Sequence, residues 1–389
     1  SPSGLPGEVS FQFPSLSLPC PAGPPLVWTT TYRSMKPVSS GHGDAWDFSY
    51  NISIEPLPAS GGASASRLVV RDGGGRADIF YRQADGSYRC DGMFREGSFS
   101  GEVFTLTFAD QGTWTFHALD GTPDAGKIAS IADRNGVALT CAYDVAGQLT
   151  SISDAFDRSL VVEWDNLSPP RIVSVSSKQN GAAVFAKTTF SYSANDRRLT
   201  AISAPSIPGR PPVAGNTTFA YATGSPDPRL NDNLLSVTDG AGRLMEAFTY
   251  SSTNAPGDIS YDTCNSHDRN RLGNIGQVCR TSFALSSGGY TMIENDELGR
   301  VCETTFDRQH RVLSCRDYTG FATPGVDVTA TANRPTGKLR ATDPDFFETT
   351  CAYNGDSRCV AITHPDGSSE RVTYQRDLKP DCPVRERGN

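Results

Sequence analysis

One spacing of aromatic, glycine and aliphatic residues recurs along the chain, and it restricts the fold more than any other feature. In the segment CAYDVAGQLTSISDAFDRSLVVEWD, Tyr143 is followed by Gly147 at +4, Leu149 at +6, Ile152 at +9 and Trp164 at +21. A fixed period of this kind is typical of repeat architectures, in which each repeat is one supersecondary unit. The segment is therefore interpreted as one copy of a unit that builds much of the chain.

A second copy supports this interpretation. In CAYNGDSRCVAITHPDGSSERVTYQRD, Tyr353 is followed by Cys359 at +6, Ile362 at +9, Gly367 at +14 and Tyr374 at +21. The matching interior spacings are much harder to attribute to chance than two spaced aromatic residues. The residues that define the repeat are Tyr143, Asp144, Gly147, Leu149, Ile152 and Trp164 in the first copy and Tyr353, Ile362, Gly367 and Tyr374 in the second.

Each unit is expected to form a strand, a turn, a second strand and a second turn. The aromatic residue ends one strand, Asp and Gly supply a turn that tolerates positive φ, and the Leu and Ile positions carry the next strand into the core. Looser copies contain Tyr192, Tyr250 and Phe306. Because a lone hairpin is marginal in water, the units must stack edge to edge. The repeat predicts an antiparallel, continuous and twisted β-sheet.

Composition agrees with an all-β chain. The 389 residues include 37 Gly and 26 Pro, distributed along the sequence, which favours many short strands joined by turns. The repeat region is predicted over residues 128–389. Residues 1–127 lack the period but are equally rich in strand patterns, with strands expected near 67–71 and 77–82, and are predicted to form a separate amino-terminal β cap domain.

Several function classes are disfavoured. The net charge is −8 and the basic residues are scattered, so no nucleic-acid partner is expected. No apolar run is long enough to span a bilayer as a helix. No GxSxG, HExxH or phosphate-loop motif occurs, and the five His residues share no ligand spacing. The chain is predicted not to be an enzyme, with no catalytic residue, cofactor or metal site.

Ten cysteines form an even set without any CxxC spacing. This pattern favours disulfides in an exported protein, secreted or at the cell surface, over metal ligation; buried free thiols in a reducing compartment are the alternative. If residues 307–310 form a four-residue hairpin loop, Cys302 falls opposite Cys315 and a cross-strand disulfide is feasible. Cys351 and Cys359 are symmetric about Gly355 and need a three-residue loop, so this second pair is the less favoured candidate.

Three segments carry a family resemblance. They are KIASIADRNGVALTCAYDVAGQLTSISDAFDRSL, ENDELGRVCETTFDRQHRVLSC and YNGDSRCVAITHPDGSSERVTY, and they resemble the bacterial RHS, or YD-repeat, family. In relatives such as Tc-toxin cocoon subunits and teneurins, these repeats spiral into a hollow β shell. The resemblance implies a structural container or surface scaffold.

Two departures restrict what the resemblance implies. The family's self-cleaving end carries a DPxGL-type motif, whereas TDPDFFE and HPDG here lack the Gly-Leu, so autoproteolysis is not expected. The repeats are too few to close a shell. The chain is therefore expected to be the amino-terminal part of a larger polypeptide, or a protomer whose open edges are covered by other chains.

The leading functional prediction is a non-enzymatic structural protein, an exported YD-repeat scaffold that forms part of a shell, sheath or surface assembly. Its expected partners are other protein chains. Two alternatives stay open. One is a module that binds surface carbohydrates by stacking sugars on Trp28, Trp46 and Trp114. The other is the front half of a cocoon that encapsulates a toxin.

Overall fold

A computed structural model gives the architecture of the chain. It describes residues 7–20, 22–35, 39–90, 93–179, 184–194, 197–207, 209, 215–252, 255–258, 260–270, 278–286, 288, 290–309, 311–322, 334–335, 337–354 and 358–373. Over these residues the secondary structure consists of thirty strands and two short 3₁₀ helices. The predicted nearly all-β fold of antiparallel hairpins is confirmed. No helix in the described ranges has the length and apolar character needed to cross a membrane.

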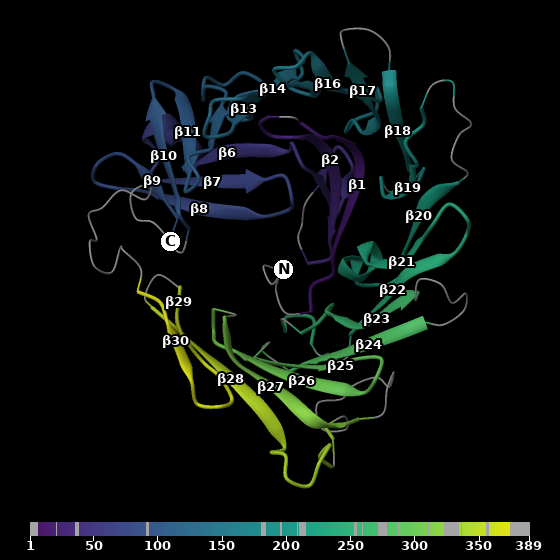
Figure 1. The fold of residues 1–389 in the computed structure, drawn as a ribbon. Coiled ribbons are helices and arrows are strands. Elements are labelled where there is room, and N and C mark those ends of the chain that lie inside the picture. Colours follow the sequence, from purple (N-terminus) through teal and green to yellow (C-terminus); the bar gives the residue numbers. More distant parts are fainter. Residues whose placement is uncertain are drawn as a thin grey trace. The chain divides into compact units, whose positions relative to one another are not determined.

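The chain divides into two compact units, which are described separately (Figure 1). The amino-terminal unit holds most of residues 11–216, and the carboxy-terminal unit holds most of residues 217–373. The predicted division after residue 127 lies between two directly paired strands, Thr113–Phe116 and Ile128–Ala132, and it stays a prediction.

The elements of the amino-terminal unit are β1 (Ser10–Leu18), β2 (Leu26–Arg33), β3 (Ser39–Ser40), β4 (Gly43–Asp44), β5 (Trp46–Phe48), β6 (Ile52–Leu57), η1 (Ala59–Ser64), β7 (Arg67–Asp72), β8 (Ala77–Arg82), β9 (Tyr88–Arg89), β10 (Arg95–Ser100), β11 (Val103–Phe108), β12 (Thr113–Phe116), β13 (Ile128–Ala132), β14 (Ala138–Tyr143), β15 (Leu149–Ser153), β16 (Arg158–Trp164), β17 (Ile172–Gln179), β18 (Val184–Tyr192) and β19 (Leu199–Ser203). From β6 to β19 each strand pairs antiparallel with the next. Ser53 of β6 also bridges Lys127, and the Ile54 N–H donates to the Gly126 carbonyl at 2.7 Å. The sheet therefore curls until the chain just before β13 lies against β6.

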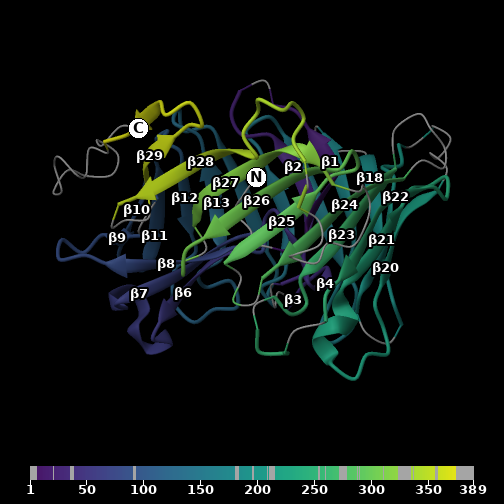
Figure 2. The same cartoon turned by 90° about the horizontal axis from the view of Figure 1, so that it is seen from below.

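The carboxy-terminal unit continues the same hairpin pattern. Its elements are β20 (Asn216–Tyr221), η2 (Pro228–Asp232), β21 (Leu234–Thr238), β22 (Leu244–Tyr250), β23 (Cys264–Asn270), β24 (Val278–Leu285), β25 (Thr291–Asn295), β26 (Arg300–Phe306), β27 (Val312–Phe321), β28 (Phe346–Tyr353), β29 (Cys359–Thr363) and β30 (Ser369–Arg371). Successive strands pair antiparallel throughout, and Figure 2 shows β24 to β28 side by side in chain order.

The core of the amino-terminal unit forms where the small β1–β2–β5 sheet packs on the repeat strands. Trp28 of β2 stacks on Phe48 of β5, with ring centroids 5.0 Å apart, and both side chains are buried. His42 lies 4.3 Å from the ring of Phe190 in β18, measured between centroids. The Thr188 hydroxyl of β18 donates to the Ser15 carbonyl of β1. Aromatic burial of this size is a large hydrophobic contribution.

A buried polar chain crosses this core. The Trp28 Nε1–H donates to His42 Nε2 at 3.1 Å, so the neutral imidazole carries its proton on Nδ1. That Nδ1–H donates to the Tyr192 hydroxyl at 3.0 Å, and the hydroxyl donates to the Ile172 carbonyl at 2.6 Å. Every polar group along this chain has a partner, which is the condition for burying such groups. Burial lowers the pKa of His42 from 6.5 to about 3.

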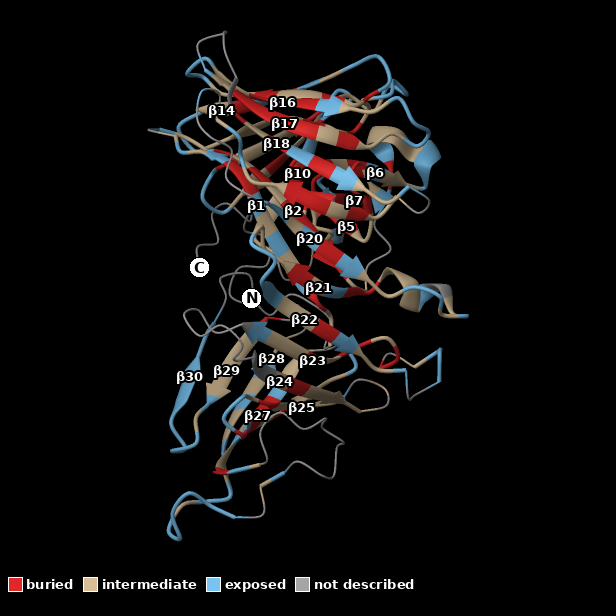
Figure 3. Cartoon of the chain, turned by 90° about the vertical axis from the view of Figure 1, so that its right-hand side faces the viewer, coloured by how far each residue is buried: buried red, intermediate tan, exposed pale blue. Residues whose placement is uncertain are grey.

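The two units differ in burial. Figure 3 shows buried positions concentrated in the amino-terminal unit, whereas β28 to β30 are mostly intermediate or exposed. In the carboxy-terminal unit, Ile293 and Val301 form a small buried cluster that Ala284 and Tyr318 cover. Because residues alternate between faces along a strand, these side chains lie on one face of β25–β27. The opposite face of the same strands has little cover.

Candidate functional site

The repeated turn is built around one aspartate. At the first copy, Asp144 Oδ1 accepts hydrogen bonds from the N–H groups of Ala146 and Gln148, at 2.9 and 2.8 Å. The Asp144 N–H donates to the Gln148 carbonyl, which closes a three-residue loop. Gly147 in this loop has a φ of 75°. A three-residue loop with a left-handed residue in its last position is a common hairpin connection.

The same turn geometry occurs repeatedly. In each case one aspartate oxygen accepts from the N–H groups two and four residues later: Asp72–Arg76, Asp133–Val137, Asp154–Arg158, Asp239–Arg243, Asp296–Arg300 and Asp307–Arg311. In the Asp239–Arg243 turn the guanidinium of Arg243 donates to Asp239 and lowers the pKa of that carboxyl. The turn at Asp72 lies in the predicted cap, between the strands that the sequence predicts near 67–71 and 77–82.

Five strands end in an aromatic residue whose side chain makes a polar contact that the sequence pattern does not predict. The Tyr143 hydroxyl donates to the Ile128 carbonyl at 2.9 Å, and Trp164 Nε1 donates to the Leu149 carbonyl at 2.9 Å. Further copies of this contact are Tyr192 to Ile172, Tyr250 to Leu234 and Tyr353 to Val312. Every acceptor is the first residue of the preceding strand. The aromatic side chain therefore ties the end of one strand to the start of its neighbour.

The other repeat-defining residues occupy strand and turn positions of the sheet. Leu149 and Ile152 of β15 are buried, with 3% and 0% of their surface exposed. Ile362 of β29 pairs with Cys351 of β28, and Gly367 has a φ of 83° in the following turn. Tyr374 lies outside the described residues. The repeat-defining residues in the described part of the chain thus act within the hairpins.

Two of the tryptophans chosen for sugar stacking are in the wrong place for that role. Trp28 and Trp46 are completely buried, so neither ring has a face on which a sugar could stack. Trp114 is half-buried against Phe108, with ring centroids 4.9 Å apart. Both rings lie in the core of the amino-terminal unit.

Trp164 instead borders an open groove of about 540 Å³. The groove lies between the Asp144 turn and the loop after β16. Its lining includes Gln148 and Asn166, which offer amide donors and acceptors, and Leu167, more than half of which is exposed. An aromatic edge beside convergent polar groups is a common form of small-ligand site.

The register of the β26–β27 hairpin differs from the predicted one. The Asp307 N–H donates to the Arg311 carbonyl, so the loop has three residues and not four, and a bulge follows between the pairs Phe306–Val312 and Thr305–Ser314. As a result Cys302 faces Asp317 and Cys315 faces Thr304. The prediction that Cys302 lies directly opposite Cys315 is wrong. Similar irregularities follow the turns at Tyr143 and Tyr353.

The second predicted pair is displaced in the same way. Cys359 faces Tyr353 and Cys351 faces Ile362, so the two cysteines are not directly opposed. Their side chains still lie close enough to interact. Burial, followed by the neighbouring Cys359, raises the pKa of the Cys351 thiol, and Cys315 contributes more weakly.

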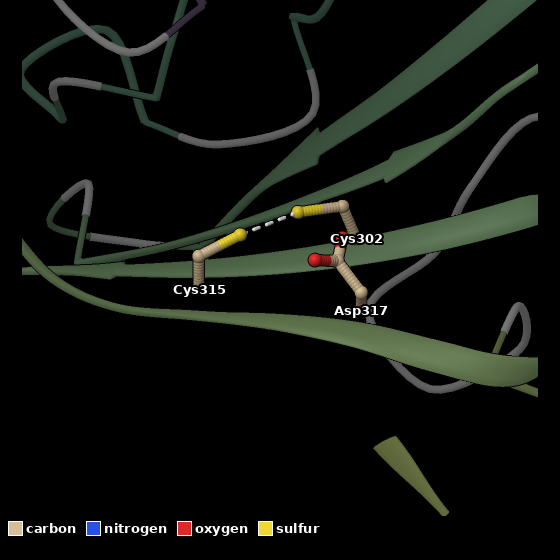
Figure 4. Close-up of side chains that lie close together, drawn as sticks. All are labelled: Cys302, Cys315 and Asp317. Carbon is tan, nitrogen blue, oxygen red and sulfur yellow. Dashed lines mark hydrogen bonds between the residues drawn. The ribbon is translucent and has the colours of Figure 1, made fainter. Parts of the chain in front are cut away.

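Cys302 and Cys315 nevertheless meet diagonally across the hairpin. Their sulfur atoms are 3.0 Å apart and are not joined in a disulfide, and Figure 4 shows the two side chains pointing toward one another beside Asp317. A hydrogen bond from the Cys302 thiol lowers the pKa of Cys315 to about 7, and the same bond raises the pKa of Cys302. A ligand atom of Cys302, Cys315 and Asp317 can be chosen so that all three lie within 4.8 Å of one another. Both thiols are half-buried, and Asp317 is exposed.

Comparison with known proteins yields structural similarity alone. No family model matches the chain, and no curated protein matches it. A crystal structure of TcdB2-TccC3 aligns with 77% of this chain and 17% of its own, at 11% identity and a TM-score of 0.33. The Tc holotoxin pore of Photorhabdus luminescens aligns with 87% of this chain and 22% of its own, at 10% identity and a TM-score of 0.31. The chain thus spans less than a quarter of these two structures, and similarity at this level supports no conclusion about function.

Proposed function

We propose that the chain is a non-enzymatic structural protein, a scaffold of repeated hairpins that associates with other protein chains. The observation that carries this proposal is the recurrence of one turn and one aromatic contact. Tyr143 and Tyr353, in different units, make the same bond to the start of the preceding strand. Selection for a reaction concentrates special geometry at one site, whereas here the special geometry is distributed along the sheet.

The exposed face of the carboxy-terminal unit supports protein partners. Leu313 of β27 and Phe347 of β28 are 41% and 47% exposed. Phe347 pairs with Asp317 and lies opposite the face of the Ile293 cluster, and Leu313 is the extra residue of the bulge that precedes Ser314. A sheet must bury its apolar face against another layer. In the proposed assembly a second copy of the chain, or the remainder of a longer polypeptide, supplies that layer.

Sedimentation velocity of the full chain tests the assembly. We expect self-association that increases with protein concentration. Phe347→Asp should weaken this association by about tenfold or more, because the substitution places a charge in the face that the other chain covers. Val145→Asp is the matched control, since Val145 is 97% exposed at a turn and should leave association unchanged. A wild-type chain that stays monomeric at all concentrations, with no ordered assembly in cryo-electron microscopy, contradicts self-assembly.

The cocoon alternative is the same scaffold with a cargo. It rests on the resemblance of the repeat segments to the YD-repeat family, and it requires that the chain be the front part of a longer polypeptide. Export, to the outside or to the cell surface, belongs to the same proposal.

A carbohydrate-binding role has one specific observation in its favour, the groove at Trp164. Since Trp164 also ties β16 to β15, the informative substitution is Asn166→Ala at the rim. We expect this change to weaken binding to a glycan array by about tenfold, the size of one lost hydrogen bond to a sugar. Asn135→Ala, in an exposed turn elsewhere, is the control. Equal glycan binding by both variants, or none by the wild type, removes this candidate.

A further inference from the structure

The sulfur atoms of Cys302 and Cys315 approach each other diagonally across the β26–β27 hairpin, so potential metal-ligand atoms lie close together on one of its faces. Cys302 faces Asp317 directly, so the carboxylate and both sulfur atoms project from the same face. On the other side of β26, Glu294 of β25 also faces Cys302. Burial raises the pKa of Glu294, with a smaller contribution from Asp296. Two thiols and one carboxylate thus lie close together on the sheet, with Glu294 as a cross-strand neighbour.

The pairing register favours ligation over a disulfide. Unstrained disulfides need closely spaced backbones, and directly opposed residues of an antiparallel pair meet that need better than diagonal ones. Cys302 and Cys315 each face another residue, Asp317 and Thr304. A metal ion can bind both sulfur atoms without backbone movement, because each metal–sulfur bond is about 2.3 Å long. A tetrahedral ion would set the two sulfur atoms about 3.8 Å apart, so they need separate only slightly from 3.0 Å.

We propose that Cys302, Cys315 and Asp317 form a binding site for a thiophilic divalent cation of the zinc type. Two thiolates and one carboxylate suit such an ion, whereas Mg²⁺ and Ca²⁺ prefer oxygen ligands alone. Water can fill the fourth position, as in zinc sites with three protein ligands. Binding releases one proton from each thiol to solvent and requires no electron transfer. The geometry of the site does not depend on the proposed scaffold function, although both use the same face of the sheet.

Cobalt(II) titration of the full chain tests the site, because thiolate ligation to cobalt gives a charge-transfer absorption. The protein is kept reduced with a phosphine, and zinc is then added as a competitor. We expect one equivalent of cobalt to produce the thiolate band and zinc to abolish it. A folded wild-type chain without the band overturns the proposal, as does a Cys302–Cys315 disulfide that the phosphine leaves intact.

Single substitutions assign the ligands. Cys302→Ser, Cys315→Ser and Asp317→Asn should each weaken cobalt binding at least tenfold, since even the loss of an outer-shell partner has an effect of that size. Cys20→Ser should leave the band unchanged, because Cys20 lies outside this hairpin. Circular dichroism verifies that each variant is folded. Retention of wild-type affinity by any of the three ligand variants contradicts the three-residue site. Cobalt binding by the wild-type chain at a concentration where sedimentation shows only the monomer would separate this site from the scaffold proposal.

Discussion

The unfolding free energy of the amino-terminal unit is expected to fall as the pH is lowered from about 6.5 toward 3, because His42 must stay neutral in the fold. Burial lowers the pKa of His42 from 6.5 to about 3. Between these values the unfolded chain binds a proton that the folded chain does not, so acid favours unfolding. The contribution of His42 is fully present above pH 6.5 and declines by about 1.4 kcal/mol per pH unit below it.

The surroundings of His42 explain why the fold resists protonation. Both ring nitrogens are engaged, Nε2 by the Trp28 indole N–H and Nδ1 by the Tyr192 hydroxyl, and Phe48 and Phe190 pack against the ring. A second proton on Nε2 would face a group that can only donate. The imidazolium would also lose its hydration without a compensating anion.

Urea denaturation monitored by tryptophan fluorescence, at intervals between pH 7.5 and 4, measures this effect. The buried Asp47 complicates the raw curve, because burial raises its pKa and gives a dependence of opposite sign in part of this range. The difference between the wild type and His42→Gln isolates the histidine, since glutamine can accept from Trp28 and donate to Tyr192 without titrating. Equal pH slopes in both proteins would show that His42 is not the acid-sensitive group.

The architecture could be predicted from sequence because the repeat is local. Asp144, Gly147 and the aliphatic positions of β15 lie within about one hairpin of each other, and turn chemistry together with alternation determines their placement. The same reasoning located the strands at 67–71 and 77–82, which are β7 and β8.

Register and long-range contacts could not be predicted in this way. The bulge after the Asp307 turn shifts the pairing, and nothing in the residue types near Leu313 marks it, so the prediction that Cys302 lies directly opposite Cys315 was wrong. The metal-ligand geometry escaped motif search because its ligands come from two strands and not from a CxxC run. Burial of Trp28 depends on contacts between distant segments, because its neighbour His42 packs against Phe190 of β18, and local patterns do not encode such contacts.

A second large effect is expected from Gly147→Ala, which should destabilise the amino-terminal unit by about 3 kcal/mol. Gly147 has a φ of 75°, a conformation that costs an L-residue about 1 kcal/mol or more. A Cβ at this position would also lie 2.2 Å from the carbonyl oxygen of Pro123. Relieving that overlap requires a backbone shift, and overpacking of this kind costs about 1–3 kcal/mol in addition.

Gly136→Ala is the matched control. Gly136 occupies the same place in the neighbouring turn of the same unit, with a φ of 80°, and an added Cβ would meet nothing within 4 Å. Its substitution should therefore cost only the conformational part, about 1 kcal/mol. Chemical denaturation of both variants yields the two losses of unfolding free energy. Equal losses would mean that the Asp144 turn does not rest on the chain at Pro123. A larger loss for Gly147→Ala would show that one copy of the repeated turn also holds a neighbouring segment in place, which the repeat pattern by itself does not require.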